Sequence, residues 1–354
     1  MLHHLLLFTI TMFCASCVPV TIFNTVPRRD TTGAIMDAHD GKVIGPIAHL
    51  GNRYLWYAAS YGNCTEPPGS NGCSDASVGN CGFQLNHNVS LWSSLDLFHW
   101  KPHGVVFSAA SSGLESPLMF CPKVLFNNVT NDWVLWANFV DGLNWGISYY
   151  AVAAAKNFTG PFVVVSRNVS TLAFEDVGDF NLFQDDDGTG YVIYTSHING
   201  PWKELHTMSV ERLSADYTKT MGVSESSGFF GPSNVEAPAY FKRGSTYYAV
   251  FGSCCCYCGG GSPVSVFTAS HPLGPYKAQA SGPIDPTIAA QQTDIASYVD
   301  SAGVEQFLWI GDRWQQAPDH IKGHDPTYWG PLKFGSDGTV SEMKFLDNFT
   351  IDVK

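Results

Sequence analysis

Short apolar runs separated by polar turns recur along the whole chain, and no segment shows a long helical periodicity. The runs are rich in Val, Ile, Tyr, Phe and Trp, and clusters of Gly, Asn, Asp and Pro lie between them. Runs of this kind are typical of buried β-strands, and the intervening residues favour turns. The pattern therefore predicts an all-β protein.

Five of the apolar runs resemble one another and recur at a spacing of roughly 55 to 80 residues. They are residues 54–57, 133–136, 191–194, 247–250 and 306–309. A Gly-Pro-aromatic motif also occurs twice, at 160–162 and 274–276. Repeats of several strands at this period are typical of propeller blades. We therefore predict a five-bladed β-propeller, as a single domain over residues 18–354, because no Pro- or Ser-rich linker appears after residue 34.

The first 17 residues have the pattern of a signal peptide, with an apolar run from Leu5 to Cys14 followed by small residues. This run is too short to span a bilayer, and a buried first strand is the alternative interpretation. Six N-x-Ser/Thr sequons also favour export and N-glycosylation. They lie at Asn63, Asn88, Asn128, Asn157, Asn168 and Asn348. We therefore expect a secreted glycoprotein.

Eight cysteines remain after residue 17, and an even number in an oxidising compartment favours disulfide bonds. Four of them lie between Cys254 and Cys258, where a zinc site is the rival interpretation. No histidine pair at ligand spacing accompanies that run, so we expect no metal and no cofactor. The pairing of the cysteines stays open.

Charge and composition narrow the choice of partner. The formal net charge is −12 and only 14% of the residues are charged, which argues against nucleic acid or an anionic membrane as a partner. Aromatic residues make up another 14%. Most of them would pack in a β-rich core, and a minority in a cleft would suit the apolar faces of sugar rings.

Ionisable residues stand at the predicted start of several blades, where an innermost strand would face a central funnel. They occur in 37–41, 178–181 and 235–238, and amides occur in 291–294. Carboxylates that converge from several blades suit glycoside hydrolysis, which needs one protonated acid and a separate group that activates water. Glu236 stands out because its neighbours are apolar, and an unpartnered carboxylate is costly there. Asp185–Asp187 and Asp96, by contrast, have the pattern of local turns.

The segment 235–242, Val-Glu-Ala-Pro-Ala-Tyr-Phe-Lys, resembles the acid-bearing strand of glycoside hydrolase family 43. Residues 179–183 followed by 187–188 resemble the strand that carries the pKa-tuning Asp of that family. Motifs at 38–39, 122–127, 291–293, 311–314 and 328–332 resemble the exo-β-1,3-galactanase subgroup, in the same order. The resemblance extends from about residue 37 to residue 353.

This resemblance implies that Glu236 is the general acid and that Asp179 orients it and tunes its pKa. Gln291 would help to position or activate the water. His39 stands where most of the wider family has its base Asp, and we expect His39 and Gln291 to face the pocket opposite Glu236, with Asp40 turned away. The predicted substrate-binding residues are His39, Asp40, Tyr57, Asn138, Asp312, Trp314, Tyr328 and Trp329.

Two positions depart from the galactanase pattern, since Phe120 and Ala59 stand where glutamates are usual; Asp37, Asp40 and Glu115 could compensate. We expect an inverting exo-glycosidase, acting as a monomer, that releases galactose from the β-1,3-galactan of arabinogalactan. An α-L-arabinofuranosidase or β-xylosidase of the same family is one alternative. A secreted carbohydrate-binding propeller without activity is the other.

Overall fold

The computed structural model describes residues 19–66, 87–114, 118–140, 148–172, 177–198, 205–253, 264–279 and 288–354. The expected signal peptide, Glu115 and the cysteines from Cys254 to Cys258 lie outside these residues.

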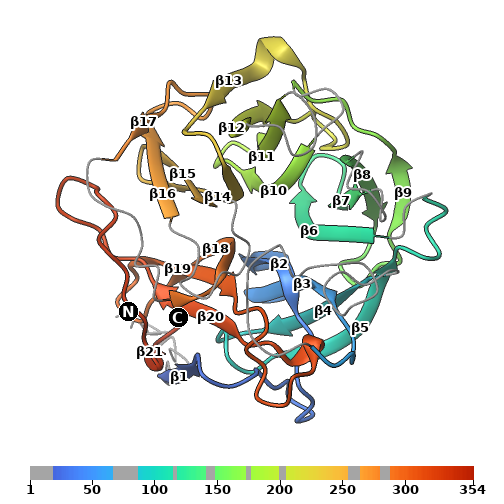
Figure 1. Ribbon diagram of the computed structural model, residues 1–354, viewed down its shortest axis with the longest axis vertical. Coiled ribbons are helices and arrows are strands. Elements are labelled where there is room, and N and C mark those ends of the chain that lie inside the picture. Colours follow the sequence, from blue (N-terminus) through green and yellow to red (C-terminus); the bar gives the residue numbers. More distant parts are fainter. Residues whose placement is uncertain are drawn as a thin grey trace, which may run out of the picture.

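Five antiparallel sheets form a ring around a central axis (Figure 1). Blade one consists of β2 (His39–Ile47), β3 (Arg53–Ser60), β4 (Asn88–Ser94) and β5 (Lys101–Ser108). Blade two consists of β6 (Leu118–Asn127), β7 (Asp132–Val140), β8 (Ser148–Ala155) and β9 (Val163–Ser166). Blade three consists of β10 (Val177–Gln184), β11 (Gly190–Ile198), β12 (Leu205–Arg212) and β13 (Ser226–Phe230).

The last part of the chain completes and closes the ring. Blade four consists of β14 (Val235–Arg243), β15 (Thr246–Ser253), β16 (Val264–Ala269) and β17 (Lys277–Ala278). Blade five consists of β18 (Gln291–Val299), β19 (Glu305–Asp312) and β20 (Thr327–Pro331). A separate two-stranded sheet pairs β1 (Val20–Phe23) with β21 (Asn348–Ile351). The predictions of an all-β fold and of a five-bladed propeller are therefore confirmed.

Three short 3₁₀ turns have both of their ends within the described ranges. They are η1 (Ala48–Leu50), η3 (Val223–Glu225) and η5 (Lys322–His324). In the part of the chain that the structure describes, no helix has the length and apolar character needed to cross a membrane.

The five apolar runs of the sequence are the second strands of the five blades, β3, β7, β11, β15 and β19. They are apolar throughout because both faces of each blade are buried against a neighbour. In β3, Tyr54 and Trp56 pack toward blade five, whereas Leu55 and Tyr57 pack toward blade two. Alternate residues of a strand point to opposite faces. A hydrophobic cluster consequently fills every junction between neighbouring blades.

Candidate active site

The first strand of each blade lies next to the ring axis, and all five are irregular near their start (Figure 1). In β2, β6, β10 and β14, two residues stand opposite one residue of the partner strand. This is the definition of a β-bulge, which breaks the alternation of side chains and redirects one of them. Asp40, Cys121 and Ala237 occupy equivalent bulge positions with φ of 53°, 50° and 53°. The bulges thus decide which side chains reach the centre of the ring.

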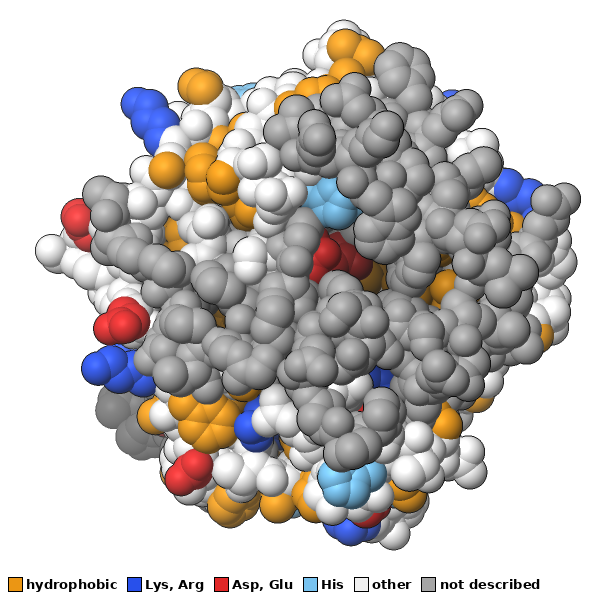
Figure 2. All heavy atoms as spheres, in the orientation of Figure 1, with side chains coloured by type: hydrophobic (Ala, Val, Ile, Leu, Met, Phe, Trp, Pro, Cys, Tyr) orange, Lys and Arg blue, Asp and Glu red, His pale blue; other side chains and the backbone are white. Residues whose placement is uncertain are grey.

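Glu236, Asp179 and Gln291 come together from blades four, three and five. The Gln291 Nε2 atom lies 3.3 Å from Glu236 Oε1. The backbone N–H of Ala237, the residue after Glu236, donates a hydrogen bond to the Asp179 carboxylate. All three side chains are partly exposed. Figure 2 shows acidic side chains at the bottom of the central opening, with a histidine beside them. The structure therefore brings the three predicted catalytic residues into one place.

Asp179 is half-buried and has polar neighbours. Burial raises the pKa of Asp179, whereas the hydrogen bond from Cys121 and the positive charge of Lys123 act in the opposite direction. The Cys121 Sγ atom lies 3.3 Å from Asp179 Oδ1, and Cys121 carries a free thiol. The carboxyl group is thus held by a thiol on one side and by the strand that bears Glu236 on the other.

Two buried lysines connect the inner strands to one another. Lys123 Nζ donates to three backbone oxygens, those of Asp40 at 2.9 Å, Gly41 at 2.6 Å and Thr293 at 2.8 Å. Lys42 Nζ forms an ion pair with Asp294 Oδ1 at 3.0 Å. It also donates a hydrogen bond to Asn181 Oδ1 in β10 at 2.9 Å. These contacts link blades one, two, three and five, so they fix the positions of the bulged strands around the axis.

Asp40 is buried at the bulge of β2. Its Oδ2 atom accepts a short hydrogen bond from the Tyr61 hydroxyl, and its backbone N–H donates to Asp312 Oδ2 at 2.7 Å. Burial and the nearby charges of Asp312 and Asp179 raise the pKa of Asp40 to about 7, although Tyr61 and Lys123 oppose this rise. The expectation that Asp40 turns away from the funnel assumed a regular strand. The bulge at Asp40 removes the basis for that expectation, because alternation does not hold across a bulge.

His39 lies outside the funnel, contrary to the sequence-based expectation. Its side chain is 0% exposed and lies 3.5 Å from a carboxylate oxygen of Asp37 and 3.5 Å from one of Asp312. Burial alone would lower the pKa of His39, but Asp312 and Asp37 outweigh it and raise the pKa to about 9. An imidazole that is buried and already protonated can neither contact a sugar nor accept a proton from water.

Trp314 contacts both His39 and Gln291. Its ring centroid lies 5.1 Å from that of His39 and 5.0 Å from that of Tyr61, and the Lys322 Nζ atom lies 4.0 Å from its centroid. Its indole Nε1 donates to Gln291 Oε1 at 2.8 Å. Asp312 supports β2 from behind and is 1% exposed. Trp314 and Asp312 therefore support the site, whereas we had predicted that they bind substrate.

Four other predicted substrate-binding residues belong to the core. Tyr57, Tyr328 and Trp329 are 0% exposed and pack in the clusters between blades. Asn138 is 3% exposed, and its amide donates to Ser148 Oγ at 2.7 Å. A sugar cannot contact these buried side chains, so we remove them from the candidate site. Ala59, one of the two departures from the galactanase pattern, is likewise fully buried.

Tyr61, Cys121 and Lys123 are the contributors that sequence analysis missed. Pro122 and Lys123 belong to a motif that resembles the galactanases. No sequence pattern predicted that Lys123 would be buried and donate hydrogen bonds to two other blades. Cys121 was counted among the possible disulfide cysteines. Their roles depend on the bulges, which the sequence pattern does not reveal.

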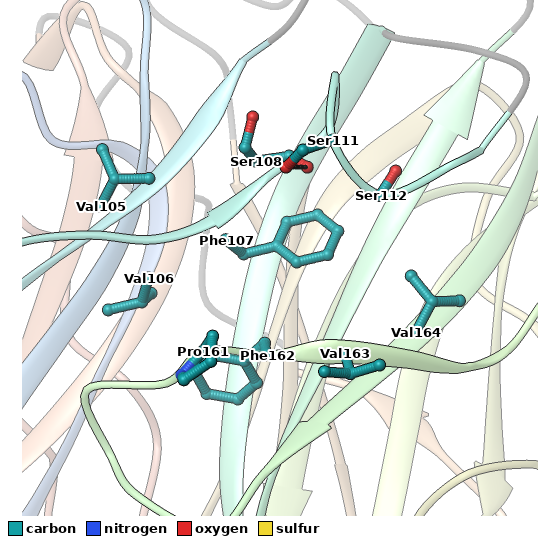
Figure 3. A pocket seen from close by; sticks show the side chains of 10 residues that line it. All are labelled: Val105, Val106, Phe107, Ser108, Ser111, Ser112, Pro161, Phe162, Val163 and Val164. Atoms are coloured by element: carbon teal, nitrogen blue, oxygen red, sulfur yellow. Dashed lines mark hydrogen bonds between the residues drawn. The ribbon is translucent and has the colours of Figure 1, made fainter.

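A pocket of about 340 Å³ lies away from the axis, between β5 and the start of β9 (Figure 3). Valine, phenylalanine, proline and serine side chains line it, with no ionisable group among them. It therefore has no means of acid–base catalysis. Among the described residues, no group of three or more His, Cys, Asp or Glu side chains could hold a metal ion.

A five-bladed propeller with carboxyl groups converging at its axis is an arrangement suited to a glycosidase. The family model of the glycosyl hydrolases family 43 matches residues 74–310. The chain belongs to this family, and a carbohydrate substrate follows from that membership. None of the curated proteins matches the sequence.

Several solved structures share the fold. An exo-β-1,3-galactanase from Clostridium thermocellum is 25% identical, with a TM-score of 0.75 over 94% of this chain and 67% of that one. A family 43 β-1,3-galactosidase with galactodeoxynojirimycin is 22% identical, with a TM-score of 0.71 over 92% of this chain and 99% of that one. An exo-β-1,3-galactanase from Phanerochaete chrysosporium with β-1,3-galactotriose is 21% identical, with a TM-score of 0.69 over 94% and 69%.

Proposed function

We propose that this glycosidase is an inverting, exo-acting enzyme that releases galactose from β-1,3-galactan. The observation that carries the proposal is the cluster of Glu236, Asp179 and Gln291 at the axis of a family 43 propeller. Support for the sugar comes from the likeness to proteins described as exo-β-1,3-galactanases and β-1,3-galactosidases.

Glu236 donates a proton to the glycosidic oxygen as the bond from that oxygen to the anomeric carbon breaks. Water attacks the anomeric carbon from the opposite face and loses a proton to a base, so the products are galactose with an inverted anomeric centre and a shortened galactan. Asp179 holds the backbone beside Glu236 through the N–H of Ala237. This contact orients the acid without taking part in bond cleavage.

Gln291 is in the wrong place to hold the attacking water. Inverting enzymes keep their acid and base roughly 6.5 to 9.5 Å apart to leave room for that water. The Gln291 amide lies only 3.3 Å from Glu236, well below that separation. Asp40 is a carboxylate in blade one that is close enough to interact electrostatically with Asp179, and it accepts a hydrogen bond from Tyr61. We therefore assign the base to Asp40, in place of the pair of His39 and Gln291.

The test is a screen of released monosaccharides from β-1,3-galactan, arabinogalactan, arabinan and xylan. Galactose alone is the expected product, and ¹H NMR during the first turnovers should show its α-anomer. Glu236→Gln keeps the shape but cannot donate the proton, so turnover should fall about 10²- to 10⁴-fold. Asp179→Asn should lose activity and keep its melting temperature. Release of arabinose or xylose, or of β-galactose, would reject the substrate or the inverting mechanism, respectively.

We propose further that the protein is secreted, N-glycosylated and disulfide-bonded, and acts as a monomer. The asparagines of five sequons, Asn63, Asn128, Asn157, Asn168 and Asn348, are exposed, and Asn88 is half-buried. Exposed asparagines in polar loops are accessible to glycosylation. Size-exclusion chromatography of the secreted protein before and after enzymatic deglycosylation tests both the glycans and the oligomeric state.

A further inference from the structure

Gln291 lies between two groups of different hydrogen-bonding character. One end of its side-chain amide lies 2.8 Å from the Trp314 indole Nε1, and the other end lies 3.3 Å from Glu236 Oε1. An indole N–H only donates hydrogen bonds, whereas an amide has an oxygen that accepts and an NH₂ group that donates. The oxygen of Gln291 must therefore face Trp314. This orientation follows from chemistry and does not depend on telling oxygen from nitrogen in the side chain.

The orientation of Gln291 determines what Glu236 can do. With its oxygen toward Trp314, the amide presents NH₂ to Glu236 Oε1. The NH₂ group only donates, so the oxygen that it meets has to accept. A carbonyl oxygen accepts better than an acid hydroxyl, so this contact favours Oε2 as the oxygen that carries the proton of the neutral acid. A reversed amide would present its oxygen and favour a proton on Oε1.

We propose that Trp314 is a positioning residue that, through Gln291, keeps the acidic proton of Glu236 on Oε2. The inference rests on the proposed role of Glu236 as the general acid. It names Oε2 as the oxygen that protonates the leaving group. It also gives Gln291 a task different from holding the attacking water.

Trp314 is well suited to such a task because its own ring is held firmly. It is 4% exposed and packs against His39 and Tyr61. The Lys322 ammonium lies 4.0 Å from the ring centroid, a favourable cation–π contact. Lys322 is itself fixed by ion pairs with Glu66 at 3.1 Å and Asp325 at 3.3 Å. These contacts hold the Trp314 ring in place, so that its indole N–H keeps a fixed direction toward Gln291.

The experiment compares wild type with Trp314→Phe, which keeps an aromatic ring and loses the N–H. Trp100→Phe is the matched control, because Trp100 is 1% exposed and its Nε1 finds no hydrogen-bond partner among the described residues. The primary readout is a ¹³C NMR pH titration of the Glu236 carboxyl group in protein labelled at glutamate, with the signal assigned through Glu236→Gln. This readout requires no turnover, so inactivity on every glycoside would reject the proposed function without affecting this test.

In Trp314→Phe the side-chain amide of Gln291 can reverse. Glu236 then loses the hydrogen-bond donor that stabilises its ionised form. A donor to a carboxylate favours ionisation. Its loss should therefore raise the titration midpoint of Glu236 by roughly half to one pH unit. The basic limb of the pH profile of kcat/KM should shift to higher pH by the same amount. The value of kcat should be about two- to tenfold lower. Trp100→Phe should leave the midpoint unchanged.

Gln291→Met removes the donor while leaving Trp314 in place, and it should raise the midpoint by at least as much. The double variant with Trp314→Phe should match Gln291→Met alone, because Trp314 acts through Gln291. An unchanged midpoint in Trp314→Phe, or additive effects in the double variant, would overturn the proposal. If Trp314→Phe failed to fold, an unchanged midpoint in Gln291→Met would overturn it equally.

Discussion

Replacing Asp40 by Asn should make the protein more stable and almost inactive at the same time. Burial raises the pKa of Asp40 from its ordinary value of 3.8 to about 7. The folded state therefore prefers the neutral carboxyl group, and ionising it costs stability. A tenfold change in proton affinity corresponds to about 1.4 kcal/mol, so the cost at pH 8 reaches roughly 4 kcal/mol. Asn is uncharged and accepts the Tyr61 hydrogen bond through its amide oxygen.

The backbone also permits this substitution. Asp40 has a φ of 53°, and Asn is among the residues that tolerate this left-handed conformation. We therefore expect Asp40→Asn to increase the free energy of unfolding at pH 8 by up to roughly 4 kcal/mol. The penalty in wild type develops as pH rises from about 4 to about 7, so the gain should vanish near pH 4.

Urea unfolding at several pH values measures the stability, and turnover on β-1,3-galactan measures the activity. Loss of a general base should lower turnover about 10²- to 10⁴-fold. Azide, a small anion, should restore part of the activity of Asp40→Ala and none of that of Gln291→Ala. A variant Asp40→Asn that is less stable than wild type at pH 8, or that retains wild-type turnover, would refute this reasoning.

Three further predictions concern other parts of the molecule. Stability should fall as pH rises from about 6.5 to about 9, because the stabilisation that protonated His39 gains from Asp37 and Asp312 is lost over this range; His39→Gln should lack this fall in pH-dependent thermal unfolding. Lys123→Met should leave three buried carbonyl groups without their donor and lower the free energy of unfolding by roughly 3 kcal/mol or more, as measured in urea. Expression in a eukaryotic host should place the protein in the medium and reveal a loss of mass on deglycosylation, whereas intracellular protein without glycans would contradict export.

The fold could be predicted because both faces of every blade are buried. Burial on both sides makes each second strand apolar throughout, as in Tyr54–Tyr57, and this run repeats once per blade. The local turns were also readable, since Asp96 accepts hydrogen bonds from the backbone N–H groups of Phe98 and His99. Such features depend on neighbours in the sequence or on a regular period.

The site was predictable only in part. Glu236, Asp179 and Gln291 stand at blade starts and were identified there. Tyr57 was placed wrongly because an aromatic ring in a strand has the same sequence signature in a core and in a cleft. His39 was placed wrongly because a single extra residue in β2 breaks the alternation on which the prediction depended.

The pairing of β1 with β21 joins one of the first described segments of the chain to one of the last. Thr21 and Thr350 are partners across this sheet, 329 positions apart. Closing so long a loop costs about 5 kcal/mol of chain entropy. Synthesis at roughly 5 to 20 residues per second also separates the two strands by about 16 to 66 seconds. During that time β1 lacks its partner, so this two-stranded sheet can form only after Ile351 has been synthesised.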